Sequence, residues 1–317
     1  MVNVKKVGII GVGNVGASIA FNLIQKGLFS EMVLIDINKE KAIGEAMDLS
    51  HGLPYASPMD IYAGEYEDLK DASIIIITSG AAQKEGETRL DLINKNSKIL
   101  KSVIDELNKI NAEGILLIVS NPVDVLTHFA IKYSSLDKSK IIGSGTVLDT
   151  ARLKYLLAKK LKVDSRNVHT VIIGEHGDSE LAVNSISNVS GIPLKEFYEM
   201  KGYTHYEETM NQIDEDVKMS AYEIIKKKGS TYYGIAMAIG KICSAIVNDE
   251  KSMLPVSTEL TGEYHLSNLA LSVPCIIGKD GVEEILEMPL STLERKELEK
   301  SANEIRKVIE NVENNGD

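Results

Sequence analysis

One histidine of this chain stands in a setting that suits proton transfer. His176 lies in the segment VIIGEHGD, in which residues 171–173 form a short apolar run typical of a buried strand. Gly174 and Gly177 allow the chain to turn after that run, so that the imidazole can face a cleft. An imidazole can both give and take a proton near neutral pH. A lone histidine is more often a hydrogen-bonded structural residue, however, and the segment by itself favours that interpretation.

A pair of opposite charges precedes this segment. Asp149 and Arg152 are three positions apart in a predicted helix that begins at Val147, so they share one helix face and can pair there. On spacing alone, a solvated surface pair is the favoured interpretation. A role beside His176 requires the fold to bring two separate segments together.

The amino-terminal residues predict the parts of a dinucleotide site. An apolar run at residues 4–10 leads into Gly11-Val12-Gly13-Asn14-Val15-Gly16 and then a helical pattern, and a second run at 33–35 ends at Asp36. Such glycines let backbone amides approach a pyrophosphate at a helix N-terminus, while the carboxylate accepts both ribose hydroxyls. Because Asp36 would repel the extra phosphate of NADP, the sequence predicts NAD. The alternative is that Asp36 caps the next helix.

Further apolar runs alternate with amphipathic segments. Four more strands are predicted at residues 59–63, 73–77, 115–119 and 140–142. Two of these runs lack polar alternation, as expected for a parallel sheet that helices cover on both faces. Six parallel strands with crossover helices give an α/β, doubly wound (Rossmann) sheet, which binds ligands beyond the carboxyl ends of its strands.

Polar residues follow two of these strands. The loop TSGAAQKEGETR comes after residue 77, and Arg89 lies where the next helix begins. A glycine-bracketed polar loop over a ligand crevice is a candidate lid, and the alternative is an ordinary solvated loop. After residue 119, Asn121 precedes Pro122, which starts a helix well. Asn121 is either a cap or a bridge between cofactor and substrate.

A glycine-rich joint, Gly143-Ser144-Gly145-Thr146, divides the chain. It predicts a nucleotide-binding domain at residues 1–144, with a lid at about 80–90, and an α+β catalytic domain at 145–317. In the second half we expect helices over 210–225 and 235–242 and an antiparallel portion from 251–260 and 275–277. Ser291 and Glu294 form a capping box for a last helix.

The composition excludes several classes of function. The 317 residues are 44% hydrophobic and 26% charged, which is ordinary for a soluble globular protein. A net formal charge of −11 leaves no basic excess for phosphates, so no nucleic-acid partner is expected. Cys243 and Cys275 fit no metal-binding spacing, so no metal is expected, and both are predicted to be reduced core residues. Since the segment MVNVKKVGII shows no signal or membrane-spanning run, we expect a cytoplasmic location and no membrane partner.

Taken together, these segments resemble the lactate/malate dehydrogenase family, and most closely its bacterial L-lactate dehydrogenases. The resemblance covers essentially the whole chain and rests on motifs in family order: GVGNVG, LID, GAAQKEGETRLDLINKN, SNPVD, GTVLDTAR, IIGEHGD and KGSTYYGIA. It implies an NAD-dependent enzyme that reversibly reduces pyruvate to (S)-lactate in fermentative glycolysis.

The resemblance also implies a role for each site residue. His176 would exchange a proton with the substrate oxygen, Asp149 would hold its other ring nitrogen, and Arg89 would polarise the carbonyl from the lid. Arg152 would clamp the substrate carboxylate through two parallel hydrogen bonds. The implied substrate contacts are Gln83, Arg89, Asn121, Arg152 and Thr231. The implied cofactor contacts are Gly11, Gly13, Asn14, Val15, Gly16, Asp36, Gly80, Ala81, Val119, Asn121 and Ser144.

Gln83 bears on the choice of substrate. In this family a neutral Gln at the lid position goes with pyruvate and lactate, and an Arg goes with oxaloacetate and malate, whose second carboxylate needs a cation. The adjacent Lys84 is a flexible cation that could substitute in part. A malate dehydrogenase, a dehydrogenase of bulkier 2-hydroxy acids and a non-catalytic NAD-binding sensor therefore stay open as alternatives.

Two further residues bear on regulation. Bacterial members of the family are often activated by fructose 1,6-bisphosphate, which an Arg and a His bind between subunits. His169 matches the histidine position, but Lys154 stands at the arginine position and lacks its bidentate fork. Activation and a plain surface role for His169 are weighed equally. The resemblance also implies a homo-oligomer, with a tetramer expected, although the chain lacks the amino-terminal arm of vertebrate members.

Overall fold

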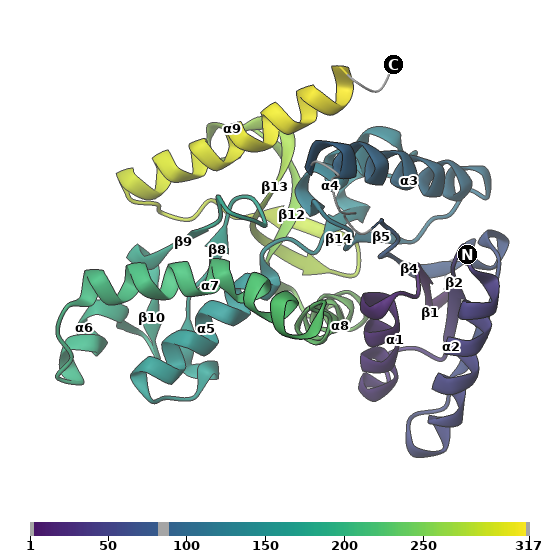
Figure 1. The fold of residues 1–317 in the computed structure, drawn as a ribbon, viewed down its shortest axis with the longest axis horizontal. Helices are drawn as coiled ribbons and strands as arrows, with labels where there is room; N and C mark the ends of the chain where they lie inside the picture. The colour runs from purple at the N-terminus through teal and green to yellow at the C-terminus, as the bar shows by residue number, and fades with distance from the viewer. Residues whose placement is uncertain (1–2, 82–88, 315–317) are drawn as a thin grey trace.

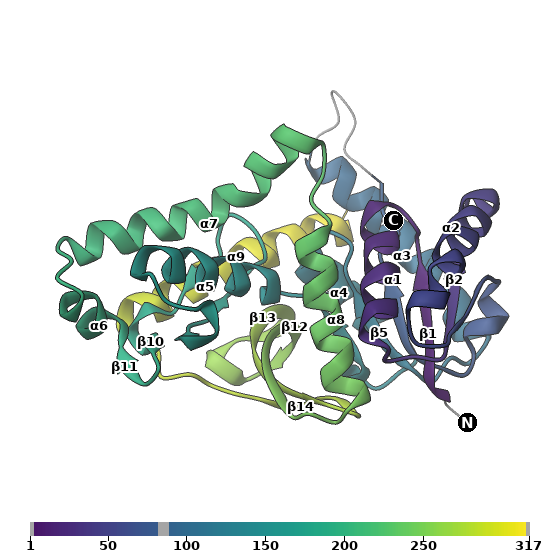
Figure 2. The same cartoon turned by 90° about the horizontal axis from the view of Figure 1, so that it is seen from below.

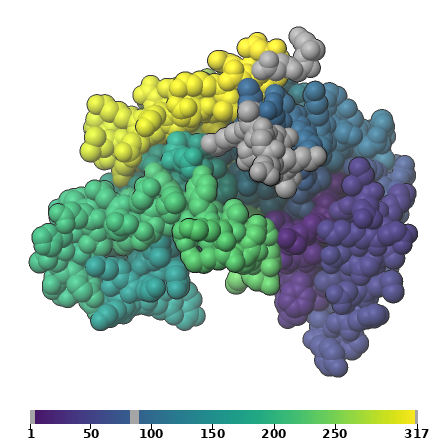
Figure 3. Space-filling view, in the orientation of Figure 1, coloured from purple at the N-terminus to yellow at the C-terminus, as the bar shows by residue number. Residues whose placement is uncertain are grey.

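The computed structural model of the chain describes residues 3–81 and 89–314, without the side chains of residues 3, 4 and 89. In the space-filling view, the amino-terminal half (purple to blue) and the carboxyl-terminal half (teal to yellow) form two lobes that meet near the middle of the face shown (Figure 3).

Six parallel strands form the framework of the first half, as predicted. They lie in the spatial order β3-β2-β1-β4-β5-β6, which is the doubly wound arrangement. Their bounds are β1 Asn3–Ile10, β2 Glu31–Ile35, β3 Asp60–Ala63, β4 Ala72–Ile77, β5 Ile115–Ile118 and β6 Ile141–Gly143. Four consecutive isoleucines of β4 are fully buried, because helices cover both faces of the sheet.

Crossover helices connect these strands. They are α1 Asn14–Lys26, α2 Lys39–His51, α3 Arg89–Lys109 and α4 Val123–Tyr133. Figure 1 shows α1 and α2 on one side of the strands and α3 and α4 on the other. The carboxyl ends of β1, β4 and β5 therefore open onto the same edge of the sheet, where the polar loops begin.

The antiparallel portion of the second half continues this same sheet. Strands β12 Ser252–Thr261, β13 Ser267–Gly278 and β14 Gly281–Ile285 follow β6 in the order β14-β13-β12-β6. Ser257 of β12 pairs with Gly143 of β6, so the last parallel strand has a partner on both sides and no exposed edge. The sequence predicted the antiparallel strands but not that they join the first sheet.

Helices build most of the second half. They are α5 Val147–Leu161, α6 Leu194–Met200, α7 Tyr206–Lys228, α8 Tyr233–Val247 and α9 Thr292–Asn314. Helix α8 packs against α1, and α9 crosses α3 and α4 (Figures 1 and 2). The predicted capping box starts α9, with the Glu294 amide donating to Ser291 Oγ at 3.3 Å and the Ser291 amide donating to Glu294 Oε2 at 2.8 Å.

Short elements complete the second half and the connections. The short strands are β7 Val168–His169, β8 Ile172–Ile173, β9 Leu181–Ala182, β10 Asn188–Val189 and β11 Ile192–Pro193. The 3-10 helices are η1 Leu53–Tyr55, η2 Tyr66–Leu69, η3 Lys138–Lys140, η4 Ser165–Asn167, η5 Asn184–Ile186 and η6 Glu263–His265. Cys243 and Cys275 are buried free thiols, as predicted. Within the described ranges, no helix combines the length and the apolar character needed to cross a bilayer.

Candidate active site

The glycine motif forms a tight turn between β1 and α1. Gly11 has a φ of +94°, and a Cβ there would lie 2.7 Å from the amide nitrogen of Ser79, so only glycine fits this position. A Cβ at Gly16 would collide with the carbonyl oxygen of Gly11. Gly13 is different, because it is exposed and a Cβ would meet no heavy atom within 4 Å. The backbone at the N-terminus of α1 is therefore open to a ligand at Gly13, and helix N-termini are places where phosphates bind.

Asp36 joins this turn to the end of β2. Its Oδ2 accepts a hydrogen bond from the Val12 amide at 2.8 Å, and its Oδ1 accepts one from the Asn38 amide at 2.9 Å. Asn38, rather than Asp36, caps α2, since its side chain accepts from the Lys41 amide at 3.2 Å. The carboxylate is thus held beside the glycine turn, where an adenosine ribose would lie.

Other strand ends bring further predicted cofactor residues to the same edge. Gly80 and Ala81 follow β4, Val119 and Asn121 follow β5, and Ser144 follows β6, with its amide donating to Ile118 O at 2.8 Å. The predicted residue Asn14, at the start of α1, donates through Nδ2 to Ser230 Oγ at 3.0 Å, and this bond ties the turn to the segment between α7 and α8.

Asn96 of α3 links two of these strand ends, and sequence reasoning missed it. Its Oδ1 accepts from the Ala81 amide at 2.8 Å, while its Nδ2 donates to the Asn121 carbonyl at 2.9 Å. The side chain is nearly fully buried. A buried asparagine must find partners for both ends of its amide, so Asn96 fixes the base of the predicted lid to the Asn121 turn. The signals in the sequence were a polar residue on the apolar face of a predicted helix and its place at the end of the motif GAAQKEGETRLDLINKN.

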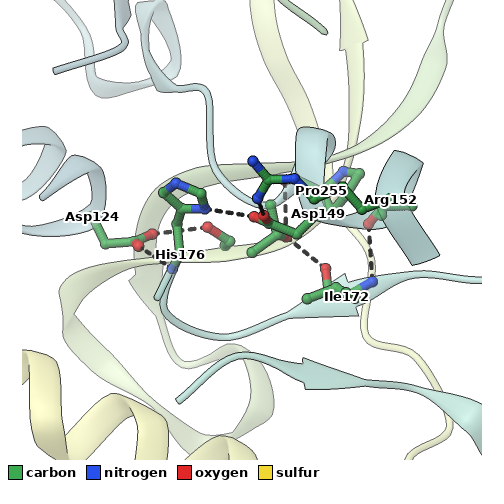
Figure 4. A network of polar contacts seen from close by, with 9 residues as sticks. Asp124, Asp149, Arg152, Ile172, His176 and Pro255 are labelled. Carbon is green, nitrogen blue, oxygen red and sulfur yellow. Dashed lines mark hydrogen bonds and ion pairs between the residues drawn. The ribbon is translucent and has the colours of Figure 1, made fainter. Parts of the chain in front are cut away.

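The structure brings His176, Asp149 and Arg152 together. His176 Nδ1 lies 2.5 Å from Asp149 Oδ2, and Arg152 Nη1 donates to Asp149 Oδ1 at 2.7 Å (Figure 4). The Asp149 side chain is 2% exposed, whereas that of His176 is 23% exposed. The surface-pair interpretation of Asp149 and Arg152 is therefore wrong, because the shared helix face points inward to the histidine.

Two threonines at the beginning of α5 hold Asp149 against His176. Thr146 Oγ1 donates to the Ile172 carbonyl at 2.5 Å, and the Ile172 amide donates to Thr150 Oγ1 at 2.9 Å. Ile172 belongs to β8, which leads directly into the turn that carries His176. These bonds fix the first turn of α5 to β8, so that two segments far apart in the sequence hold one hydrogen-bonded pair.

The electrostatics of this pair favour a charged imidazole. Burial lowers the pKa of His176, but the nearby Asp149 carboxylate and its hydrogen bond outweigh burial and raise that pKa to about 9. Burial raises the pKa of Asp149, but the positive charges of His176 and Arg152 hold it below its ordinary value. His176 therefore keeps its proton through the neutral range.

Asp124 supports His176 from the other side and was not predicted as a site residue. Its Oδ2 accepts from the His176 amide at 2.7 Å, and its Oδ1 accepts from Ser272 Oγ at 2.8 Å (Figure 4). Burial raises the pKa of this carboxyl, while its hydrogen bonds to His176 and Ser272 oppose the rise. Asp124 positions the backbone of the histidine. Its place in the SNPVD motif, in the first turn of α4, was the available signal.

Glu180 is a second acid that sequence reasoning missed. It is 5% exposed, and a carboxylate oxygen of Glu180, a carboxylate oxygen of Asp149 and a ring nitrogen of His176 all lie within 4.8 Å of one another. The hydrogen bond between His176 and Asp149 joins two of these three groups. The signal in the sequence was an acid four positions after the histidine, directly before β9.

Some predicted site residues lie away from His176, and others lie outside the residues that the structure describes. Thr231 lies half-buried between α7 and α8. Gln83 and Lys84 lie outside the described residues, as does most of the predicted lid, and Arg89 is described only as the first residue of α3. Lys154 and His169 line a separate cavity of about 570 Å³, whose lining includes neither His176 nor Arg152.

The chain is similar to known proteins over nearly its whole length. The sequence profile of the lactate/malate dehydrogenase NAD binding domain matches residues 5–143, and that of the alpha/beta C-terminal domain matches residues 146–315. An L-lactate dehydrogenase of Acetivibrio thermocellus is 50% identical over 310 residues, which are 98% of each chain. An L-lactate dehydrogenase of a Thermoanaerobacter species is 49% identical, covering 98% of this chain and 99% of its own.

Solved structures are equally similar. A lactate dehydrogenase from a deep-sea metagenome library of the Medee basin superposes with a TM-score of 0.96 at 44% identity, over 99% of this chain and all of the other. A minor L-lactate dehydrogenase of Enterococcus mundtii superposes with a TM-score of 0.94 at 41% identity, over 96% of this chain and 98% of its own.

Proposed function

The chain belongs to the lactate/malate dehydrogenase family, and from this premise we propose that it is an L-lactate dehydrogenase, which reversibly reduces pyruvate to (S)-lactate with NADH. One observation carries the proposal: the carboxylate of Asp149 holds both the imidazole of His176 and the guanidinium of Arg152. A proton donor and a carboxylate clamp thus lie side by side, as a small 2-oxo acid requires.

The two nitrogens of His176 have different tasks in this mechanism. Nδ1 faces Asp149, so Nε2 is left to give its proton to the substrate oxygen during reduction and to take it back during oxidation. Asp149 fixes the orientation of the ring and stabilises its cationic form. A guanidinium has five N–H donors, so the single hydrogen bond from Arg152 to Asp149 leaves donors for a substrate carboxylate.

The cofactor-binding residues fit NAD. The open side at Gly13 and the carboxylate of Asp36 beside the glycine turn support this assignment. When bound, the nicotinamide supplies or accepts the hydride. We assign the cofactor contacts to the glycine turn, Asp36 and the residues after β4, β5 and β6.

The remaining substrate contacts are proposals that the family membership supports. Arg89 would polarise the substrate carbonyl from the lid, and Asn121 would orient substrate and cofactor at the end of β5. Thr231, in the segment between α7 and α8, would contact the substrate. Gln83 would favour pyruvate over oxaloacetate, because a neutral amide offers no cation to a second carboxylate.

Oxidation of NADH with a panel of 2-oxo acids tests the substrate. We expect pyruvate to have the highest kcat/KM, and Gln83→Arg to move the preference towards oxaloacetate. An unchanged ratio of the two kcat/KM values would contradict the pocket assignment. Preference for oxaloacetate or a bulkier acid in the unmodified chain would favour those dehydrogenases instead, and NADH binding without turnover would indicate a sensor.

We also propose the activation, assembly and domain division. Lys154 and His169 line one cavity, and burial lowers the pKa of the Lys154 ammonium, which an anionic ligand would reverse. The shared cavity supports fructose 1,6-bisphosphate as the activator, whereas the proposal of a homotetramer depends on family membership alone. The matched ranges 5–143 and 146–315 support the division at residues 144 and 145. Superimposable pyruvate saturation curves with and without the bisphosphate would remove the activation proposal. The proposed fermentative role predicts that deletion of the gene lowers lactate production, and the proposed cytoplasmic location predicts that cell fractionation recovers the activity with the cytoplasm.

A further inference from the structure

A buried acid lies behind the proton carrier, and the mechanism above gives it no task. Glu180 ends the turn that begins after β8, and its amide donates to the Gly177 carbonyl at 3.2 Å. It is 5% exposed, and one of its carboxylate oxygens lies within 4.8 Å of both an Asp149 oxygen and a His176 ring nitrogen. Charges so close together and so poorly exposed interact much more strongly than charges in water.

The charges that act on Glu180 come from three parts of the fold. Asp149 and Arg152 reach it from α5, His176 from its own turn and Lys218 from α7. Asp124 faces His176 from α4. Other charged residues line the cavity beside Glu180, from its own turn and from α6, α7 and α9: Glu175, Asp178, Lys195, Glu207, Asp214, Glu215, Glu294, Glu297, Lys300 and Glu304. Asp149 and His176 are the neighbours whose ligand atoms lie within 4.8 Å of its carboxylate.

In these surroundings, Glu180 has a pKa near neutral pH. Burial raises the pKa of Glu180 to about 8 and the negative charge of Asp149 adds to the rise, while His176, Arg152 and Lys218 oppose it. Ionised Glu180 in turn contributes to the raised pKa of His176. The charge of Glu180 and the proton of His176 are therefore linked.

We propose that Glu180 is a positioning residue that adds to Asp149 in stabilising the protonated imidazole of His176, and so raises the pH at which the enzyme changes from reducing the oxo acid to oxidising the hydroxy acid. This inference rests on the proposed proton-carrying role of His176. Reduction needs the imidazolium and oxidation needs the neutral ring, so a nearby carboxylate favours reduction and disfavours oxidation.

The test is Glu180→Gln, which removes the charge and keeps the shape of the side chain. We expect the alkaline limb of kcat/KM for pyruvate to move about one pH unit lower. At pH 9 the variant should therefore have about fivefold lower kcat/KM for pyruvate, and at pH 8 about fivefold higher kcat/KM for lactate. NADH affinity should be unchanged, because Glu180 lies outside the proposed cofactor contacts.

Matched variants separate charge from packing. Asp178→Asn removes an acid from the same turn, but Asp178 is exposed and its carboxylate accepts from the Tyr222 hydroxyl at 2.9 Å. The alkaline limb of the pH profile of kcat/KM should therefore not move in Asp178→Asn. Glu180→Asp keeps the charge, so its alkaline limb should lie close to that of wild type. Superimposable pH profiles of Glu180→Gln and wild type would overturn the proposal, as would an equal shift in Glu180→Asp. If Glu180→Gln does not fold, Glu180→Ser removes the same charge.

A chemical probe tests Glu180 independently of the substrate. Diethyl pyrocarbonate acylates an imidazole only in its neutral form, because the protonated ring has no free lone pair. The pH dependence of labelling at His176, read by peptide mass spectrometry, therefore reports the proton of that residue. We expect labelling of Glu180→Gln to begin about one pH unit lower than in wild type. Equal labelling curves would reject the role of Glu180 even if the chain turned over no 2-oxo acid, whereas a shifted curve without turnover would reject only the proposed function.

Discussion

The glycine turn and the histidine cluster are built in opposite ways. The turn uses one continuous stretch, from β1 through α1 to the end of β2, and most of its donors are backbone amides. The cluster uses side chains from α4, α5, the β8–β9 turn and β13, and almost all of them are buried acids or their partners. Substitutions that add volume should therefore disturb the glycine turn most. Substitutions that remove a charge should disturb the histidine cluster most.

Removing the charge of Asp149 should have the largest effect. Asp149→Asn keeps the shape of the side chain but takes away the carboxylate that holds His176 and Arg152. We expect kcat/KM for pyruvate at pH 7 to fall by about 10²–10⁴-fold, because His176 loses the carboxylate that orients its ring and keeps it protonated. Steady-state kinetics measure this, with NADH affinity by fluorescence as the control. A loss of less than tenfold in kcat/KM would contradict the expectation that the histidine cluster depends on its charges.

The same variant has a signature in the pH dependence of stability. The pKa of folded His176, about 9, lies above its ordinary value of 6.5, so its charge stabilises the fold fully below pH 6.5 and less and less up to pH 9. The difference in Tm between wild type and Asp149→Asn should shrink over that window. A difference in Tm that grows with pH would contradict a raised pKa of His176 in the folded state.

Adding one methyl group to the turn should have a smaller effect. Gly16→Ala puts a Cβ against the Gly11 carbonyl, so we expect a loss of about 1–3 kcal/mol in the free energy of unfolding. Gly13→Ala is the matched control, because its Cβ meets nothing within 4 Å. Gly13 is the N-cap residue of α1, where Ala is less favourable than Gly, so Gly13→Ala should lose no more than about 1 kcal/mol. It should nevertheless bind NADH more weakly. Thermal unfolding and NADH titration separate the two variants, and equal unfolding of both would contradict the collision at Gly16.

The smallest expected effect concerns cofactor choice. Asp36→Ser removes the carboxylate that would repel a ribose 2′-phosphate, so the ratio of kcat/KM for NADPH to that for NADH should rise by about tenfold. Because Asp36 also accepts from the Val12 amide, NADH affinity should fall as well. Initial rates with both cofactors measure the ratio. A ratio that does not move would show that Asp36 only holds the turn.

Much of the molecule was predictable from the sequence because its signals are local. The apolar run, the glycines and Asp36 specify a strand, a turn and a second strand within 36 residues, and the observed bounds of β1 and β2 differ little from the predicted ones. The capping box of α9 and the parallel strands were predictable for the same reason, since hydrophobic periodicity and capping act over a few residues.

The cluster around His176 was different, because its energetics depend on contacts across the chain. Spacing placed Asp149 and Arg152 on one helix face but favoured the wrong environment, and it gave no role to Asp124, Asn96 or Glu180. Whether an acid is solvated or buried against a histidine decides its pKa, and burial depends on how separate elements pack. The motifs of the sequence by itself determined the family, the cofactor turn and the candidate proton carrier. Only the tertiary structure decided that Thr146 and Thr150 hold α5 against β8, that β12–β14 complete the first sheet, and that two further acids flank the histidine, because such contacts join residues far apart in the chain.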